Sequence, residues 1–587
     1  MADRDPTNAE IADALSELGD LYELDGAIVH RVAAYRTAAK AIRESSVSVA
    51  ALARQGRATE LTGIGKTLQE KILALVETGS IPAAEKLRAK FPAGLVALTR
   101  LPGLGPKRAR LLHSELGVDS PEALREAAES QRLRTVKGLG PKFEQSVLSS
   151  LEQAATQPPD RSGRVLLPRA LEVGDAIIAG LLGDPTDPGD AAAGVEAQLA
   201  GSIRRCADSV KDIDIVAVTP DPKALIERLA GLEQIESVSS SSGSGARART
   251  HAGIGVDLRI GAPGQLGSLL QHFTGSGRHN AALREAAARR GLHVSEYGIL
   301  DDATAGGPEP YATEEEVYER LGLAYIEPEL REDRGELEAA AQRDGLPRLV
   351  ELGEIRGDLH SHTIASDGRY TIVEMGLAAR ERGYEYLAIT DHSASHGFGD
   401  AVSPDQLERQ IELVAQADER VEGIELLAGS EVNILPDGSL DYEDDLLARL
   451  DWVIASVHTS FGMSEQAMTE RIIAAVEHPL VRAIGHPTGR KIEARAPYAV
   501  DLEAVFAAAA RTDTMLEING NPDRRDLPDV HARAAARAGV MIIVDSDAHR
   551  TGTLENMRWG VATARRAWLT AEQVANTRPW AQLRRAG

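Results

Sequence analysis

Two aspartates, Asp212 and Asp214, stand one residue apart in the apolar run DIDIV, and this spacing strongly constrains the local fold. On a β-strand alternate side chains share a face, so we expect both carboxylates on one side and Ile213 and Ile215 in the core. Adjacent carboxylates repel each other unless a cation lies between them. A third carboxylate, Asp257, lies in the strand-like run GVDLRI. Three carboxylates on neighbouring strands can hold two magnesium ions for in-line attack on a phosphate.

The residues before this strand, GSIRRC at 201–206, carry groups that bind phosphate. At a turn, Gly201 and Ser202 offer backbone N–H groups and a hydroxyl to a phosphate tail, and Arg205 adds a charge-assisted contact. The simpler alternative is an edge strand with two surface aspartates, because D-x-D alone is a weak signal. The Gly-Ser and Arg-Arg pairs before the strand and the later V-D-L-R run favour the metal site.

Together these segments resemble the family X DNA polymerases, the nucleotidyltransferases that include polymerase beta. The run FTGSGRHNAALR at 273–284 is similar to that family's segment for the incoming nucleotide and the template. The resemblance implies that the metal-binding carboxylates are Asp212, Asp214 and Asp257. It implies that the residues contacting the nucleotide and the template are Ser202, Arg205, Phe273, Gly275, Asn280 and Arg284. Two residues depart from the family pattern: Cys206 replaces a glycine after the double arginine, and His272 replaces a tyrosine before the Phe-Thr-Gly-Ser turn.

Three short turns with glycine on either side of an apolar residue repeat in LTGIGKTLQ, LPGLGPKRA and VKGLGPKFE. Each glycine pair permits a tight turn, and the N–H groups at the start of the following helix face a DNA phosphate. The turns resemble helix-hairpin-helix motifs, which bind the DNA backbone without reading sequence. Three ordinary helix–helix turns are the alternative. The candidate DNA-binding residues are Gly63, Gly65, Gly103, Gly105, Lys107, Gly138, Gly140 and Lys142.

The first helical region also resembles the lyase domain of polymerase beta, through VHRVAAYRTAAKAI at 29–42. Lys71 falls where that family keeps its Schiff-base lysine and is therefore the candidate lyase residue. A lysine is a nucleophile only when neighbours or burial lower its pKa. Because Arg31 and Thr67 occupy two usually basic positions, we favour binding of a DNA 5′-phosphate by the same pocket over lyase chemistry.

From residue 356 onward the chain alternates apolar strands with helices, and residues able to bind metals follow the strands. The carboxyl ends of parallel strands are where a βα barrel builds its site. The H-x-H pair in DLHSH suits a strand, on which both rings lie on one side. Scattered core histidines are the alternative, which the repeated strand-end placement disfavours. The candidate metal ligands are His360, His362, Asp367, His392, Glu431, His458, His486, Asp547 and His549.

This pattern resembles the PHP (polymerase and histidinol phosphatase) family of trinuclear phosphoesterases. The resemblance implies one metal held by His360, His362, Glu431 and Asp547, a second by Glu431, His458 and His486, and a third by Asp367, His392 and His549. Imidazole-rich, thiol-free ligation suits up to three zinc, manganese or iron ions, whereas the palm carboxylates suit magnesium or manganese. The implied chemistry is hydrolysis of a phosphate ester, with Arg490 of HPTGR binding a neighbouring phosphate.

Length and charge agree with this division. A chain of 587 residues is too long for one core, and a net charge of −24 at first counts against DNA binding. Residues 1–155, however, carry 21 basic and 20 acidic side chains, so the acidity lies in the later part of the chain. Local basic loops must therefore carry any DNA contact. One cysteine and an acidic, polar N-terminus lead us to expect a cytoplasmic, nucleoid-associated protein with no membrane segment.

We therefore predict a multidomain chain that combines α+β and α/β parts. The expected domains are a lyase-like helical domain at 1–90, a fingers-like helix-hairpin-helix domain at 91–155, a nucleotidyltransferase palm at 156–264, a thumb at 265–330, a linker at 331–355 and a PHP-type distorted βα barrel at 356–587. This architecture implies a monomeric repair polymerase that fills short gaps, using gapped or nicked DNA and deoxynucleoside triphosphates. Its PHP domain would add 3′–5′ exonuclease, abasic-site endonuclease or 3′-phosphatase activity.

Two alternatives remain open. One is a scaffold that binds DNA ends and keeps only the PHP hydrolase active, against which the intact Asp212, Asp214 and Asp257 count. The other is a small-molecule phosphatase tethered by the remaining domains, against which the repeated hairpins count.

Overall fold

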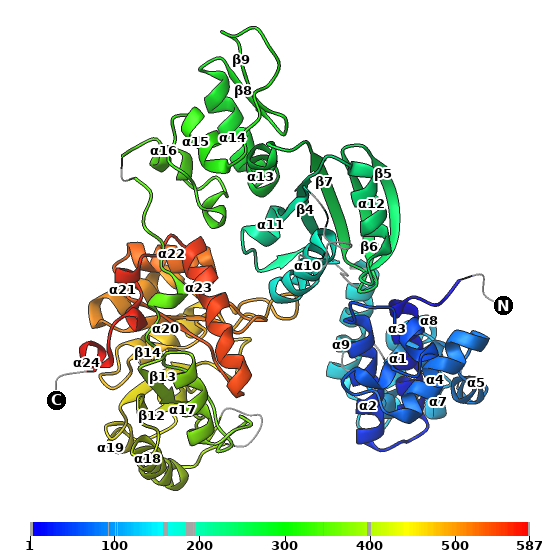
Figure 1. Ribbon diagram of the computed structural model, residues 1–587. Helices are drawn as coiled ribbons and strands as arrows, with labels where there is room; N and C mark the ends of the chain where they lie inside the picture. Colours follow the sequence, from blue (N-terminus) through cyan, green and yellow to red (C-terminus); the bar gives the residue numbers. More distant parts are fainter. Residues whose placement is uncertain are drawn as a thin grey trace. The chain divides into compact units, whose positions relative to one another are not determined.

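The computed structural model describes residues 4–91, 93–99, 101, 104–156, 163–183, 192, 194–343, 345–395 and 401–584 (Figure 1). The chain divides into two compact units. The first comprises Met1–Val165, Glu172–Ala197 and Lys211–Ile260, and the second comprises Leu166–Leu171, Gln198–Val210 and Gly261–Gly587. Within the described ranges, no helix is both long and apolar enough to cross a membrane.

The N-terminal region is helical and shares one core. A capping box of Thr7 and Glu10 starts the first helix, and apolar residues at helical spacing, such as Ile11, Leu15 and Leu18, are fully buried. The helices are α1 (Asn8–Leu24), α2 (Val29–Arg43), α3 (Val49–Arg54), α4 (Lys66–Thr78), α5 (Pro82–Arg88), α6 (Ala93–Thr99), α7 (Pro106–Leu116), α8 (Pro121–Glu129) and α9 (Pro141–Thr156). Ile72, Leu112 and Leu133 from later elements join the same cluster.

The three predicted hairpins have the same construction. The central apolar residue of each, Ile64, Leu104 and Leu139, is buried, while the described flanking glycines are exposed. The first glycine of two hairpins has a positive φ, +85° at Gly63 and +89° at Gly138. A buried anchor with exposed backbone on both sides makes each turn rigid and leaves its N–H groups accessible to a partner. Gly103 lies outside the described residues.

We predict that Gly138→Ala destabilises the third hairpin by about 1–2 kcal/mol, because a Cβ is disfavoured at positive φ. No atom lies within 4 Å of the position that the new methyl group would occupy, so backbone conformation alone sets the cost. Gly138→Asn is the matched control, since asparagine tolerates the left-handed region. Hydrogen exchange of amides in α8 and α9 measures the effect. Faster exchange in the alanine variant than in the asparagine variant is expected, and equal protection in both would contradict the argument.

The palm is built on a five-stranded sheet with the order β2–β4–β7–β6–β5. The strands are β2 (Glu196–Leu199), β4 (Asp212–Val218), β5 (Ile235–Ser242), β6 (Gly245–Thr250) and β7 (Gly255–Gly261), and the helices α10 (Leu167–Leu182) and α12 (Pro222–Gly231) accompany them. On β4, Ile213 and Ile215 are fully buried, whereas Asp212 and Asp214 are half-buried. The serine-rich stretch after residue 236 forms the β5–β6 hairpin. Since β4 and β7 are neighbours, the sheet carries all three aspartates of the predicted palm site on adjacent strands.

The thumb combines helices with a two-stranded sheet. Its elements are α13 (Leu266–Thr274), α14 (Gly277–Ala288), β8 (Leu292–Ser295), β9 (Gly298–Asp301), α15 (Glu314–Arg320), η3 (Pro328–Leu330) and α16 (Glu336–Ala340). The stretch 331–355, which we expected to be a linker, is packed: Ala340 and Leu349 belong to the thumb core. Its charged composition was misleading, because Arg331 is fully buried on Glu314 and Glu336 is fully buried 2.7 Å from His279.

The C-terminal region confirms the predicted distorted βα barrel. Seven parallel strands follow one another in sequence order: β10 (Gly357–Asp358), β11 (Tyr386–Ile389), β12 (Glu425–Asn433), β13 (Trp452–Ser456), β14 (Ala483–Ile484), β15 (Met515–Asn519) and β16 (Ile542–Asp545). A parallel bridge between Ser361 and Ala548 joins the ends of the first and last strands, so the sheet nearly closes.

Apolar side chains fill both faces of the barrel sheet. On β11, Leu387 and Ile389 belong to one core cluster, and Tyr386 and Ala388 belong to another. This alternation is what a strand buried on both sides requires. The surrounding helices are α17 (Ile372–Glu381), α18 (Pro404–Asp418), α20 (Glu465–Val476), α21 (Leu502–Thr512), α22 (Asp529–Arg537) and α23 (Met557–Arg566).

Candidate metal centre and nucleotide-binding residues

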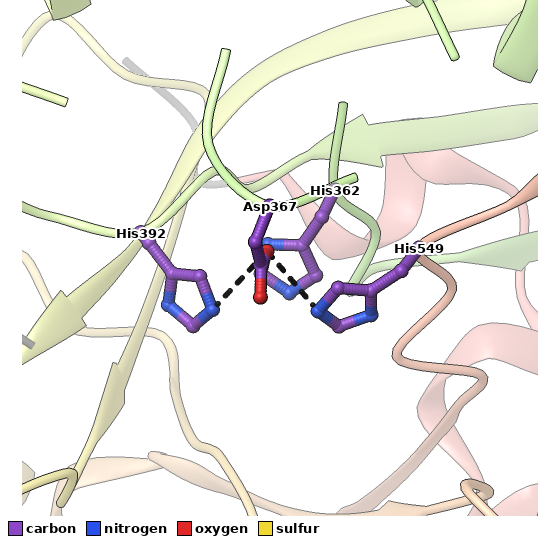
Figure 2. A group of neighbouring side chains, drawn as sticks. All are labelled: His362, Asp367, His392 and His549. Carbon is purple, nitrogen blue, oxygen red and sulfur yellow. Dashed lines mark ion pairs between the residues drawn. The ribbon is translucent and has the colours of Figure 1, made fainter. Parts of the chain in front are cut away.

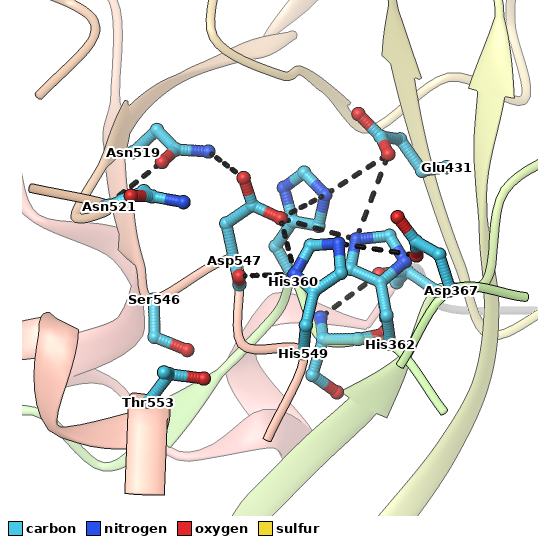
Figure 3. Close-up of polar contacts among 12 residues, drawn as sticks. His360, His362, Asp367, Glu431, Asn519, Asn521, Ser546, Asp547, His549 and Thr553 are labelled. Atoms are coloured by element: carbon cyan, nitrogen blue, oxygen red, sulfur yellow. Dashed lines mark hydrogen bonds and ion pairs between the residues drawn. The ribbon is translucent and has the colours of Figure 1, made fainter. Parts of the chain in front are cut away.

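The barrel brings all the predicted metal ligands to the carboxyl end of its strands. Each strand is short, and its direction fixes where the next side chain points. His360 and His362 follow β10, His392 follows β11, Glu431 lies on β12, His458 follows β13, His486 follows β14, Asp547 and His549 follow β16, and Asp367 lies in the loop after β10. Figure 3 shows several of these side chains converging from different strands.

Three groups of potential ligand atoms form, each with all its atoms within 4.8 Å of one another. The first joins His362, Asp367, His392 and His549, the second joins His360, His362 and Asp547, and the third joins His392, Glu431 and His458. In Figure 2, Asp367 lies between two imidazoles, with its Oδ1 3.6 Å from His392 Nε2 and 3.2 Å from His549 Nε2. These groups differ from the expected sets in three ways: His362 and His392 are each shared by two groups, Glu431 belongs only to the third group, and His486 belongs to none of them.

The Glu431 carboxylate lies among four imidazoles. Its Oε1 is 3.1 Å from His458 Nε2 and 2.9 Å from His486 Nε2, and its Oε2 is 2.9 Å from His392 Nδ1 and 3.4 Å from His360 Nε2. Should cations bind here, this buried carboxylate would supply them with negative charge beside the imidazoles.

The residues fit a metal cluster. His362 is fully buried; its Nε2 lies 3.2 Å from Asp547 Oδ1, whereas its Nδ1 makes no hydrogen bond. A buried polar atom without a partner is costly, and a metal ion would satisfy it. The donors are imidazoles and carboxylates without thiolate, the set that suits zinc, manganese and iron.

The electrostatics of the cluster show how strongly its charges depend on one another. Burial disfavours the charged form of Glu431, but His458 and His360 outweigh it and hold the pKa of this carboxyl well below its usual range. Burial together with the neighbouring His549 and His392 lowers the pKa of His362 to about 4. At neutral pH the carboxylate is therefore ionised and His362 is neutral, the forms in which each binds a cation.

Several residues that orient the cluster were missed by the sequence analysis. Glu517, fully buried on β15, lies 2.7 Å from His360 Nδ1 through its Oε1, and its other oxygen accepts the backbone N–H of His486. Asn519 donates to Asp547 Oδ2 at 3.0 Å. Such partners fix the ring orientation and leave the opposite nitrogen for a metal. The available signal was the strand MLEIN, which has a carboxylate in an otherwise apolar run.

A cavity of about 680 Å³ opens over the cluster, and basic side chains line it. They are Lys491, Arg495, Arg524 and Arg550. Arg490, which we expected to bind a phosphate, instead donates to the carbonyls of Arg524 and Arg525 and pairs with Asp208 at 2.8 Å. Ligand-type side chains surrounded by positive charge form a site suited to a phosphate-containing substrate.

The palm carboxylates have a different environment. Asp212 and Asp214 are on β4 and Asp257 is on the adjacent β7. The Arg259 guanidinium pairs with the Asp257 carboxylate: Arg259 Nε lies 2.9 Å from Asp257 Oδ1, and Arg259 Nη2 lies 3.0 Å from Asp257 Oδ2. A cation entering this site would therefore compete with the Arg259 guanidinium for Asp257.

The predicted nucleotide residues of the second unit lie on two short segments. Gly201, with φ +60°, and Ser202 belong to α11 (Gly201–Arg204), which Arg205 ends. Arg205 donates to the carbonyl of Thr274 at 2.7 Å, so this turn contacts the Phe273–Gly275 segment. Asn280 donates to the carbonyls of His272 and Gly275, whereas Arg284 is exposed on α14.

The predicted DNA-binding residues of the first unit surround helix starts. Gly65 and Gly105 are the N-caps of α4 and α7, and neither helix has a side-chain cap. Lys107 and Lys142 are exposed in the first turns of α7 and α9. Lys71 is half-buried on α4.

Models of four families match the chain. A helix-hairpin-helix domain matches residues 6–81, a SAM-like helix-hairpin-helix tandem matches 95–153, the DNA polymerase beta thumb matches 269–332 and the PHP domain matches 358–519. These parts on one chain define a family X DNA polymerase fused to a PHP domain.

Similarity to another protein extends along nearly the whole chain. The DNA polymerase/3′-5′ exonuclease PolX of Bacillus subtilis (strain 168) is 36% identical over 571 residues, which cover 97% of both chains. The chain therefore belongs to the PolX family, which confirms the resemblance to a family X polymerase fused to a PHP domain. A probable phosphatase of Thermoanaerobacter sp. (strain X514) is 34% identical over 239 residues, 38% of this chain and 89% of its own. A probable phosphatase of Syntrophotalea carbinolica is 30% identical over 234 residues, 37% of this chain and 90% of its own.

We predict that His362→Ala lowers the metal content of the purified protein, because His362 belongs to two of the three ligand groups. His478→Ala is the matched control, since His478 pairs with Asp444 outside the cluster. Elemental analysis after gel filtration measures bound zinc, manganese and iron. At least one equivalent should be lost from the first variant and none from the second. An unchanged metal content in folded His362→Ala would contradict the ligand assignment.

Proposed function

We propose that this protein is a DNA polymerase that fills short gaps during DNA repair and also degrades DNA from the 3′ end. The observation that carries the proposal is that one PolX-family chain combines three aspartates on neighbouring palm strands with a barrel cluster in which imidazoles dominate. Two phosphate chemistries with different metals follow from this difference.

In the palm, we propose that Asp212, Asp214 and Asp257 bind magnesium or manganese ions. When bound, these ions supply charge stabilisation for the phosphoryl group in transfer. Asp257 also accepts the proton of the primer hydroxyl once the Arg259 guanidinium has moved away from its carboxylate. Arg205 and Ser202 bind the triphosphate, with Gly201 offering its backbone N–H.

The other proposed contacts are with the sugar and base of the nucleotide. Phe273, Gly275 and Asn280 hold the incoming nucleotide, and Arg284, exposed on α14, reaches the template strand. The turn hydrogen bonds of Asn280 fix the 272–275 backbone against which the sugar would pack.

In the barrel, we propose up to three zinc, manganese or iron ions held by the ligand groups described above. When bound, the ions supply Lewis-acid activation of water and of the phosphoryl oxygens. Glu517 and Asn519 hold His360 and Asp547 in place for this chemistry. Lys491, Arg495, Arg524 and Arg550 attract and orient the phosphodiester.

We propose that the hairpins bind gapped or nicked DNA. Gly63, Gly65, Gly103, Gly105, Gly138 and Gly140 let the DNA backbone approach closely, and Lys107 and Lys142 add charge. Lys71 serves a 5′-phosphate pocket in this proposal, with lyase chemistry as its alternative. We expect a monomer that works on the chromosome in the cytoplasm, since DNA is its substrate.

A second candidate activity for the barrel is removal of a 3′-phosphate. The observation that favours it is the similarity to proteins named probable phosphatases over most of their own length. A terminal monoester and an internal diester differ in one substituent, and a cavity of about 680 Å³ has room for both.

We predict that Asp257→Asn lowers nucleotide addition by at least about a hundredfold, because it removes a metal ligand and a proton acceptor while keeping the shape. Glu233→Gln, at an exposed acidic position, is the control and should leave addition unchanged. Primer extension on a one-nucleotide gap with magnesium measures addition, and loss of label from a 3′-labelled strand with manganese measures degradation. Degradation should continue in both variants. Extension by Asp257→Asn at near wild-type rate would overturn the proposed palm site.

A further inference from the structure

Arginines of the barrel domain hold the backbone of the turn at 205–208, within the second compact unit. Arg566, the last residue of α23, donates Nη1 to the carbonyl of Arg205 at 2.6 Å. Arg525 is fully buried and donates Nη1 to the carbonyl of Cys206 at 2.9 Å. The same guanidinium lies 3.2 Å from Asp208 Oδ1. Two successive carbonyls beside the proposed triphosphate residue are therefore bound by side chains of another domain.

Cys206 explains why the turn needs this support. Its φ is +55°, the left-handed region that a side chain with a Cβ disfavours. Such a conformation persists where surrounding contacts determine it. Here they are the Arg525 hydrogen bond and an apolar cluster in which Trp559 of α23 packs with Ile203 and Val210.

The Glu332 carboxylate joins the turn to the barrel through a shared oxygen. Glu332 Oε1 is 3.0 Å from Arg205 Nε and 3.0 Å from Arg566 Nη1. The three side chains are 16%, 13% and 9% exposed, respectively, so water screens them little. Arg566 is in turn 3.0 Å from Asp529 Oδ2, which Arg334 also contacts at 2.8 Å. Positive and negative groups thus alternate from Arg205 to Arg334.

This arrangement decides how much of the Arg205 charge remains for a ligand. With Arg566 present, the shared oxygen divides its negative charge between two guanidinium groups. Without Arg566, Glu332 would interact with Arg205 alone and would compete with any anion that approaches it.

We propose that Arg566 is a positioning residue for nucleotide addition: through Arg566 and Glu332, the barrel domain sets the affinity of Arg205 for the deoxynucleoside triphosphate. The inference rests on the proposed function, in which Arg205 binds the triphosphate. It assigns to the barrel domain a role in synthesis that is separate from its hydrolytic cluster.

The test compares steady-state gap filling by Arg566→Ala, Glu332→Gln and the double variant. Arg566→Ala should raise KM for the nucleotide about tenfold, with a smaller change in kcat, as expected for one network interaction. Glu332→Gln should leave KM unchanged or lower it, because it removes the competing charge. The double variant should return to the KM of Glu332→Gln, since the harm in Arg566→Ala requires the charged carboxylate.

Arg565→Ala is the matched control. Arg565 precedes Arg566 on α23 and pairs with Glu329 at 2.6 Å and Glu327 at 3.6 Å. The Arg565→Ala substitution therefore removes comparable ion pairs with the same thumb segment. Its KM for the nucleotide should stay at the wild-type value. Thermal unfolding of all variants shows whether any of them fails to fold.

The outcomes distinguish a failure of the role of Arg566 from a failure of the proposed polymerase function. A KM that is equal in Arg566→Ala and Arg565→Ala overturns the role of Arg566 alone. A raised KM in Arg566→Ala that Glu332→Gln does not relieve means that Arg566 acts only through packing, which also overturns it. If the wild-type protein adds no nucleotide, the proposed function fails and this inference fails with it.

Discussion

Carboxylates held partly or fully away from water need a positive partner, and this requirement governs the molecule. It applies to the three aspartates on adjacent palm strands and to the carboxylates at the barrel mouth. In the palm the counter-charges on Asp257 are Arg259 at 2.9 Å and Arg247 at 3.5 Å. In the barrel, Glu431 lies among imidazoles, and these imidazoles would bind a metal cluster in place of the carboxylate. The barrel strands bring ligand atoms within 4.8 Å of one another, and the palm strands carry three aspartates on neighbouring strands.

Much of this arrangement could be predicted from the sequence, because strand geometry converts local spacing into three-dimensional placement. The alternation in DIDIV sets the exposure of Asp212 against the burial of Ile213, and the H-x-H pair follows a barrel strand as expected. Partners far apart in the chain could not be predicted in this way. The strand MLEIN marks Glu517 as unusual, but nothing in the sequence indicates that its partner is His360, and nothing near Glu332 indicates that Arg205 and Arg566 share it.

The charged composition of one segment led to a wrong prediction, because its buried charges are paired. The stretch 331–355 has the charge of a linker, yet it packs into the thumb because Arg331 and Glu336 find buried partners in Glu314 and His279. This packed segment brings Glu332 to the turn at 205–208 and to α23. A conventional flexible linker could not hold such a contact. The connection between synthesis and hydrolysis in this family member is thus a structured segment with its own ion pairs.

The central claim is that two separate metal centres carry two separate reactions. The most direct measurement assays both on one gapped DNA with the double variant His360→Ala, His362→Ala, after circular dichroism has shown it to be folded. The account predicts that 3′–5′ degradation is lost while gap filling with magnesium continues at a rate close to that of the wild type. Degradation at the wild-type rate would place hydrolysis outside the barrel, and loss of gap filling in the folded variant would show that the centres are not separable.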